Sequence, residues 1–191
     1  MQQCSSSFII PDLKFTELHE ALEVFRESKD PGAFKYVYQQ LSGKLYYICL
    51  RYLKNEGDAQ DVLQETFVAA YRKIDAFTGN GSFEGWIKRI AVNNCLQKLK
   101  TDKKNFAFNN SLHDEDLPEE TTHDLDHEET EARLLRAMNE LPVGYRTILN
   151  LAILEDYSHK EIGLLLNITE STSRSQLSRA KAVLKEKLER P

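Results

Sequence analysis

The segment SHKEIGLLLNITESTSRSQLSRA, residues 158–180, carries the signals for two short helices separated by a tight turn. Ser158 and Glu161 have the spacing of a capping box, in which a hydroxyl and a carboxylate bond to free backbone amides at a helix start. Gly163 lies in the middle of the first helix, where glycine costs stability. We therefore expect another helix to approach the backbone closely at this position.

The second helix of this segment has two faces of different character. Asn167 suits the left-handed conformation that the turn before it needs, and Thr169 suits its cap. The side expected to be buried carries Leu177, Ala180, Leu184 and Leu188. The opposite side carries short hydroxyl side chains and arginines, namely Ser171, Arg174, Ser175, Ser178 and Arg179. Such a face can enter a DNA groove, where arginine binds guanine or phosphate, so the pattern predicts a helix-turn-helix. A helical hairpin with a solvated polar face is the alternative.

The rest of the chain also shows helical rather than strand periodicity, so we expect an all-α fold. Three successive helices each have one apolar face. The first face consists of Phe34, Val37, Leu41, Leu45, Ile48 and Tyr52, and the second of Ala59, Val62, Leu63, Phe67, Ala70 and Ile74. The third consists of Trp86, Ile87, Ile90, Ala91 and Leu99. Glycine and asparagine place a loop at residues 77–82, and the third helix is expected over residues 83–104. Pro142 suits the first turn of a further helix that runs through Ile153.

Charge divides the chain into basic modules and one acidic segment. The net charge is −5, yet residues 105–131 hold ten acidic residues and no lysine or arginine, which leaves +5 for the remainder. This segment has few large apolar residues, so we expect a flexible acidic linker between two small helical domains.

The cysteine content and the lack of long apolar runs limit the cellular compartment in which we expect the protein. Cys4, Cys49 and Cys95 are odd in number and far apart, which fits neither a disulfide framework nor a zinc site and favours a reducing cytoplasm. No apolar run reaches the roughly 20 residues of a membrane helix, and we expect no direct membrane insertion. The first ten residues do not resemble a secretory signal.

Two of the predicted helices expose charged faces of opposite sign. The helix near residue 60 exposes Asp58, Asp61, Gln64, Glu65 and Arg72, although such a stripe is usually a solvated face. The next helix carries Lys88, Arg89, Lys98, Lys100, Lys103 and Lys104, with Asn93 and Gln97 as neutral hydrogen-bonding groups. Trp86 and Phe83 at its start either anchor the core or support a site for an unpaired base.

Several motifs together resemble those of bacterial sigma factors. The runs DAQDVLQETF at residues 58–67, FEGWI at 83–87 and IAVN at 90–93 are similar to sigma region 2. Leu141-Pro142 with Arg146, then Glu161-Ile162, then TSRSQL at residues 172–177, are similar to region 4. With only these two regions, the chain is identified as a member of the extracytoplasmic-function (ECF) group. We expect an extension at residues 1–31, region 2 at 32–104, the linker at 105–131 and region 4 at 132–191.

The resemblance implies a role for each charged face. In this family the acidic helix docks on the clamp helices of the largest polymerase subunit, here through Asp58, Asp61, Gln64 and Glu65. The loop at residues 77–83 and Asn93 would capture a flipped base of the minus-ten element, with Arg89, Lys98 and Lys100 on phosphates. The minus-thirty-five element would be read as duplex by Ser171, Thr172, Arg174, Ser175, Ser178 and Arg179.

The resemblance also implies partners and chemistry. Core RNA polymerase, including its flap, and promoter DNA are the expected partners, together with an anti-sigma factor that in this family is often anchored in the membrane. No cofactor, metal or catalytic residue is expected, because polymerase performs the phosphoryl transfer. Three positions depart from the usual pattern: Ser178, Ser173 and Asn167.

Two other interpretations remain open at the level of the sequence. A plain regulator would use only the helix-turn-helix and would bind duplex DNA without polymerase. An enzyme is the second alternative, since His123 and His127 stand four residues apart among carboxylates, with His113 nearby. Histidines in an acidic linker are more often solvated than metal-bound.

Overall fold

The computed structural model describes residues 15–101 and 127–189, and every regular element in these ranges is helical. The first range contains α1 (Leu18–Ser28), α2 (Pro31–Leu53), α3 (Glu56–Lys73), the short 3-10 turn η1 (Ile74–Ala76) and α4 (Phe83–Thr101). The second contains α5 (His127–Glu140), α6 (Val143–Leu149), the π-helical turn η2 (Asn150–Leu154), α7 (His159–Leu166) and α8 (Glu170–Glu189). Most of the predicted acidic linker lies outside the described residues, but its last residues, 127–131, form the start of α5, so the second helical unit begins before the predicted boundary at residue 132.

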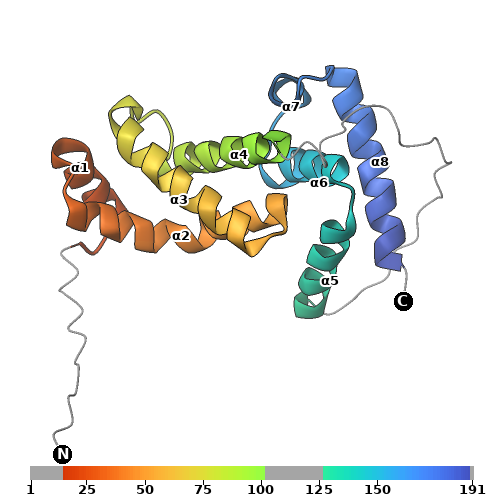
Figure 1. The fold of residues 1–191 in the computed structure, drawn as a ribbon, viewed down its shortest axis with the longest axis horizontal. Coiled ribbons are helices and arrows are strands. Elements are labelled where there is room, and N and C mark those ends of the chain that lie inside the picture. Colours follow the sequence, from red (N-terminus) through yellow and green to blue (C-terminus); the bar gives the residue numbers. More distant parts are fainter. Residues whose placement is uncertain (1–14, 102–126, 190–191) are drawn as a thin grey trace, which may run out of the picture.

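Helices α2, α3 and α4 pack side by side around one apolar core (Figure 1). The six apolar residues predicted to face inward from the second helix are all buried, five in α3 and Ile74 in η1, and the predicted face of α2 is buried or half-buried along its length. Cys49 of α2 and Cys95 of α4 are both free thiols inside this core. The three-helix prediction for residues 34–101 is therefore confirmed.

Helix α1 has no counterpart in the sequence analysis, which treated residues 1–31 as an extension. It packs on α2 by burying Ala21 and Phe25, and the Phe25 ring lies 5.0 Å from that of Phe34 and 5.4 Å from that of Tyr71. Lys29 adopts a left-handed conformation after α1, and the Asp30 side chain then caps α2. This helix therefore belongs to the same packed unit as α2–α4.

The C-terminal helices form the predicted helix-turn-helix with one difference upstream. Pro142 is the cap before α6 rather than its first residue, and the predicted continuous helix changes to the π-helical turn η2 after Leu149. The wider turn accommodates one extra residue, and such turns are frequent at functional positions. Residues of α8 pack against a small core formed by Met138, Leu141, Tyr145 and Leu149.

The two helical units contact each other where α2 ends. Helix α6 lies against that end in Figure 1, and one polar side chain from α6 and one from η2 reach the last turn of α2. Arg146 donates to the carbonyl oxygen of Tyr52 at 3.0 Å, and Asn150 donates to that of Arg51 at 3.3 Å. The last carbonyls of a helix have no partner within it, so these bonds complete α2. The sequence left the placement of the two units open.

Gly163 has the close neighbour that its position predicted, although this neighbour is the turn before α8 rather than a helix. A Cβ atom at residue 163 would lie 2.8 Å from the carbonyl oxygen of Ile168. Gly43 in α2 is a contrasting case, because nothing lies within 4 Å of a Cβ atom there. The first glycine is therefore required by packing, whereas the second is not.

We predict that Gly163→Ala lowers the free energy of unfolding by about 1–3 kcal/mol, because the turn backbone must move to admit the methyl group. Gly43→Ala is the control, expected to stabilise the protein by about 0.5–1 kcal/mol because alanine restricts the unfolded chain and favours helix. Urea unfolding followed by circular dichroism measures both. Equal effects of the two substitutions would contradict the packing argument.

Candidate nucleic-acid and protein interfaces

The turn between α7 and α8 has the geometry that its sequence predicts. Ser158 and Glu161 form the complete capping box, and the hydrogen bonds from Ser158 lower the pKa of the Glu161 carboxyl. Asn167 is left-handed, with φ of 56°. Thr169 then accepts a hydrogen bond from the amide of Thr172 at 3.0 Å. These bonds fix the angle at which α8 leaves the turn.

The predicted reading face of α8 is exposed over its first three turns. The five side chains that share it are Ser171, Arg174, Ser175, Ser178 and Arg179, whereas Thr172 beside them is half-buried. Arg174 forms an ion pair with Glu170 one turn before it, and the Ser175 hydroxyl donates to the carbonyl of Thr172 at 3.0 Å. The arginine is therefore held along the helix while its outer side stays open to solvent.

Ser173 is buried, although most helices of this kind would place an apolar residue there. Its hydroxyl oxygen lies 2.9 Å from Nδ1 of His159, the first residue of α7. The serine thus contributes a hydrogen bond across the turn in place of an apolar contact. This pair explains one of the three departures from the expected pattern.

The acidic surface of α3 is formed by Asp61, Gln64 and Glu65, all three exposed. They line a shallow hollow of about 520 Å³ together with Val68, Arg72, Asn94 and Lys98. Asp58, predicted to share this surface, is half-buried, and its carboxylate lies 2.8 Å from the ammonium group of Lys98. The predicted acidic residues therefore come together on one side of the α3–α4 pair.

The four α4 residues predicted to bind DNA do not share one face. Arg89 and Asn93 are exposed and one turn apart, and Lys100 follows two turns later on the same side. Lys98 stands two and a half turns after Arg89, which places it opposite, against the acidic hollow. Helical spacing alone would have separated Lys98 from the other three.

The loop between η1 and α4 is supported by three packed rings. The Phe77 ring lies 5.5 Å from that of Phe83 and 5.6 Å from that of Trp86. Phe77 and Phe83 are buried and Trp86 is half-buried, so the tryptophan acts mainly as a core anchor. Residues 78–82 between them are exposed, and their backbone groups are accessible to a ligand.

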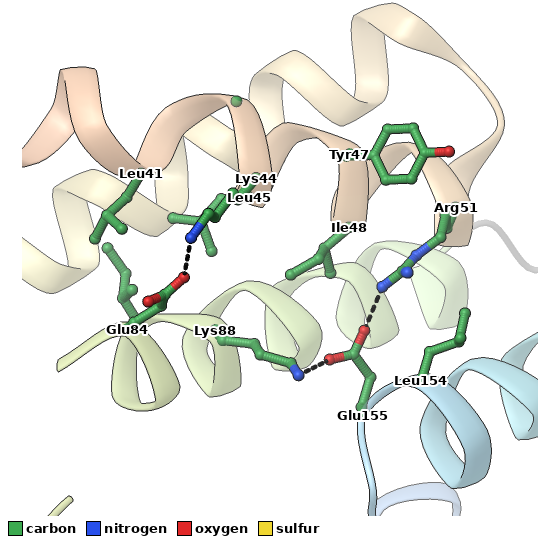
Figure 2. A pocket seen from close by; sticks show the side chains of 12 residues that line it. Leu41, Lys44, Leu45, Tyr47, Ile48, Arg51, Glu84, Lys88, Leu154 and Glu155 are labelled. Carbon is green, nitrogen blue, oxygen red and sulfur yellow. Dashed lines mark hydrogen bonds and ion pairs between the residues drawn. The ribbon is translucent and has the colours of Figure 1, made fainter. Parts of the chain in front are cut away.

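A buried carboxylate joins the two helical units at a position that the sequence analysis missed. Figure 2 shows Glu155 between two cations, with Arg51 of α2 at 2.5 Å and Lys88 of α4 at 2.6 Å. The Glu155 side chain is 0% exposed, and burial also lowers the pKa of Arg51. Local sequence patterns carry no signal for this contact, because Arg51 and Glu155 are 104 residues apart.

Other candidate sites find no support in the described part of the chain. Residues 15–101 and 127–189 contain no group of three or more histidine, cysteine or acidic side chains arranged to hold a metal ion. His113 and His123 lie outside these ranges. None of the described helices is both long enough and apolar enough to cross a membrane.

Comparison with known proteins assigns both units. Residues 37–105 match the family of sigma-70 region 2, and residues 131–184 match that of sigma-70 region 4. Together these matches cover well over half of the sequence. The chain belongs to the ECF group of sigma-70 factors. It is a promoter-recognising factor for transcription initiation. Members of this family bind core RNA polymerase and promoter DNA and are not known for enzymatic activity.

Similar full-length proteins support the same assignment. The ECF RNA polymerase sigma factor SigW of Bacillus subtilis is 29% identical over 83% of this chain and 90% of its own length. The ECF RNA polymerase sigma-E factor of Haemophilus influenzae is 28% identical over 84% and 89%, respectively.

Solved structures share the fold at low sequence identity. CnrH in complex with the cytosolic domain of CnrY has a TM-score of 0.50 at 22% identity, covering 89% of this chain and 96% of CnrH. The sigma factor RpoE of Bartonella quintana, solved with the anti-sigma factor NepR, has a TM-score of 0.52 at 19% identity, covering 82% and 97%. Both are similar to this ECF factor in fold.

Proposed function

We propose that this ECF factor holds polymerase on one side of the α3–α4 pair and promoter DNA on the other. The observation that carries the proposal is the position of Lys98. It lies in the acidic hollow with Asp61 and Glu65, half a helical turn away from the side of α4 that carries Arg89 and Asn93. One compact unit can therefore bind a protein and a nucleic acid at once without overlap.

The acidic surface is the proposed contact with the clamp helices of the largest polymerase subunit. Asp61, Gln64 and Glu65 would make this contact directly, because all three are exposed and adjacent. Asp58 is already paired with Lys98, so we assign this pair to the polymerase side rather than to DNA. The prediction that Lys98 binds a DNA phosphate is not favoured by this geometry.

The minus-ten element would bind at the opposite side of α4. Arg89 and Lys100 offer charge to phosphates, and Asn93 between them offers an amide to a flipped base. The exposed loop at residues 78–82 adjoins this side and is held by the three packed rings below it. A rigid base under a polar loop suits the capture of a single base.

Helix α8 would read the minus-thirty-five element in duplex form. Its exposed face offers Arg174 and Arg179 to bases or phosphates, with Ser171, Ser175 and Ser178 short enough to allow close approach, and Thr172 beside them. The pairing of Arg174 with Glu170 holds the guanidinium along the helix before DNA arrives. Region 4 is also the proposed partner of the polymerase flap.

Further parts of the proposal concern the setting of the protein. We assign residues 32–104, with α1 packed on them, to one functional unit and the residues from His127 onward, where α5 begins, to the other, and propose that the chain itself catalyses no reaction. It would act in the cytoplasm, where polymerase and DNA are found. An anti-sigma factor is a proposed regulator, supported by the fold neighbour RpoE, which was solved with the anti-sigma factor NepR.

We predict that the purified factor binds a promoter fragment weakly alone and specifically once core polymerase is added. Gel shift on a promoter library with and without core polymerase measures this, and transcription in vitro confirms initiation. Strong sequence-specific binding by the free protein, unchanged by core polymerase, would favour a polymerase-independent regulator and contradict the proposal.

Charge reversal at the acidic surface tests the polymerase contact. Asp61→Lys combined with Glu65→Lys is expected to weaken core association at least tenfold, because two ammonium groups in place of the two carboxylates would repel a basic partner surface. Glu20→Lys combined with Glu27→Lys on α1 is the control, since it changes the net charge equally at exposed positions elsewhere. Helical content should be unchanged in both variants. Equal affinity of the two variants for core polymerase would refute the assignment.

Arg174→Ala tests the reading face of α8. We expect a loss of about 1–3 kcal/mol of discrimination at one base position if the guanidinium binds a base edge. Lys181→Ala, exposed two turns further along α8, should weaken binding to all sequences alike. Binding measurements by polymerase holoenzyme across single-base promoter variants distinguish the two patterns. A uniform loss with Arg174→Ala would assign this residue to phosphate instead.

A further inference from the structure

Arg51 and Lys88 converge on a single carboxylate from different helices. The Nη2 atom of Arg51 lies 2.5 Å from Oε1 of Glu155, and the ammonium of Lys88 lies 2.6 Å from Oε2 (Figure 2). The exposed fractions of the three side chains are 17%, 33% and 0%, respectively. The two cations belong to the region 2 unit, and the carboxylate belongs to region 4.

Without the carboxylate, this place would be a binding site for some other anion. The two cations border a groove of about 570 Å³ between α2 and α4, whose apolar walls include Leu41 and Ile48. Two like charges held close together on a partly apolar surface repel each other and are poorly hydrated. A negatively charged ligand relieves both costs, as Glu155 does in this structure.

The backbone of region 4 is shaped to deliver Glu155 to these cations. The amide of Glu155 closes the π-helical turn η2 by donating to the carbonyl of Asn150 at 3.0 Å, and Asp156 then turns the chain with φ of 55°. The one-residue insertion of a π-turn rotates the side chains that follow it. Glu155 thereby points back toward α2 and α4 rather than into solvent.

The same contact covers part of the candidate DNA-binding side of α4. Lys88 directly precedes Arg89, and Arg89, Asp156, Tyr157 and Glu161 together border a small hollow between the units. Further along α4, Lys100 donates to the carbonyl of Leu165 at 3.1 Å. Region 4 therefore lies over two ends of this helix, while the acidic surface of α3 stays exposed.

We infer that Arg51 and Lys88 form an anion site that exchanges its occupant. Glu155 fills the site in the free chain and holds the two units together, and a backbone phosphate of promoter DNA fills it when the units separate on polymerase. A phosphate is the favoured ligand because the site continues directly into Arg89 and Asn93 on α4. The DNA half of this inference rests on the function proposed above, whereas the closed state of the free chain does not.

Reciprocal charge reversal tests the closed state without polymerase or DNA. Small-angle X-ray scattering should show a larger radius of gyration for Glu155→Lys and for Lys88→Glu than for the wild type. The double variant, Lys88→Glu with Glu155→Lys, should return part of the way to the compact value, because the pair of residues 88 and 155 is restored with its charges exchanged while Arg51 loses its carboxylate partner. Lys44→Glu is the control, since Lys44 borders the same groove but pairs with Glu84 at 2.9 Å.

Each outcome of this cycle is decisive. Far-UV circular dichroism checks that both units stay helical in every variant, and Glu155→Gln provides a milder change that removes the charge with little change in size. Compact single variants, or a double variant as expanded as the singles, would overturn the inference that this pair holds the units together. Expansion by Lys44→Glu equal to that by Lys88→Glu would also overturn it.

Promoter binding by reconstituted holoenzyme tests the exchange. Glu155→Ala releases region 4 but keeps both cations, so its promoter affinity should be no weaker than that of the wild type. Lys88→Ala weakens the same contact, leaving only Arg51 on Glu155, but it also removes a phosphate ligand, and the slope of log affinity against log salt should fall by about 0.7–0.9. The loss should be the same on every promoter sequence, because phosphate contacts carry no base information.

The two variants together separate the possible failures. Equal salt slopes for Lys88→Ala and Glu155→Ala would overturn the phosphate assignment. A loss of core polymerase binding by Lys88→Ala would instead make the site a protein contact and would also overturn it. If wild-type holoenzyme showed no promoter binding, the proposed function would fail, while the scattering cycle would still decide whether Glu155 closes the free chain.

Discussion

The carboxyl end of α2 is the point on which the arrangement of the molecule depends. The carbonyl groups of Arg51 and Tyr52 have no partner further along that helix, and Asn150 and Arg146 from the other unit supply their hydrogen bonds. Arg146 is itself buried, and this burial lowers its pKa to about 10. A buried donor and an unfinished helix end thus satisfy each other, which fixes where region 4 lies on region 2.

This placement affects the candidate surfaces of the protein unequally. The acidic surface around Asp61 and the outer face of α8 around Arg174 remain exposed, so neither has to be uncovered before a partner binds. The side of α4 with Lys88 and Lys100 is in contact with region 4 instead. In the proposed function, the contact with polymerase would therefore form first, and the part of the α4 side that region 4 covers would become available to the melted strand after the two units move apart.

Local sequence signals accounted for the helices but not for their assembly. The apolar spacing of α3 and the capping box at Ser158 depend on residues within a few turns, so they could be predicted and are confirmed. Helix α1 was missed although a local signal was present, because Leu18, Ala21, Leu22 and Phe25 repeat at helical spacing and all four pack on the core. The Glu155 cluster depends on a contact about a hundred residues away, which no periodicity encodes.

The polar character of the interface bears on how readily it opens. Apolar residues of region 4, Ile148, Leu151, Ile162 and Leu166, belong to the same buried cluster as the region 2 core and supply general attraction. The intact buried ions add little net stability relative to an apolar contact, because their desolvation offsets most of their attraction, but removal of one partner is strongly destabilising because the others stay buried without a counter-charge. These ions fix the orientation of region 4 on region 2, because any other placement of region 4 in the interface would leave Glu155 and Arg146 buried without partners. Such an interface closes in one geometry only, and a competing anion can replace its central carboxylate at modest cost.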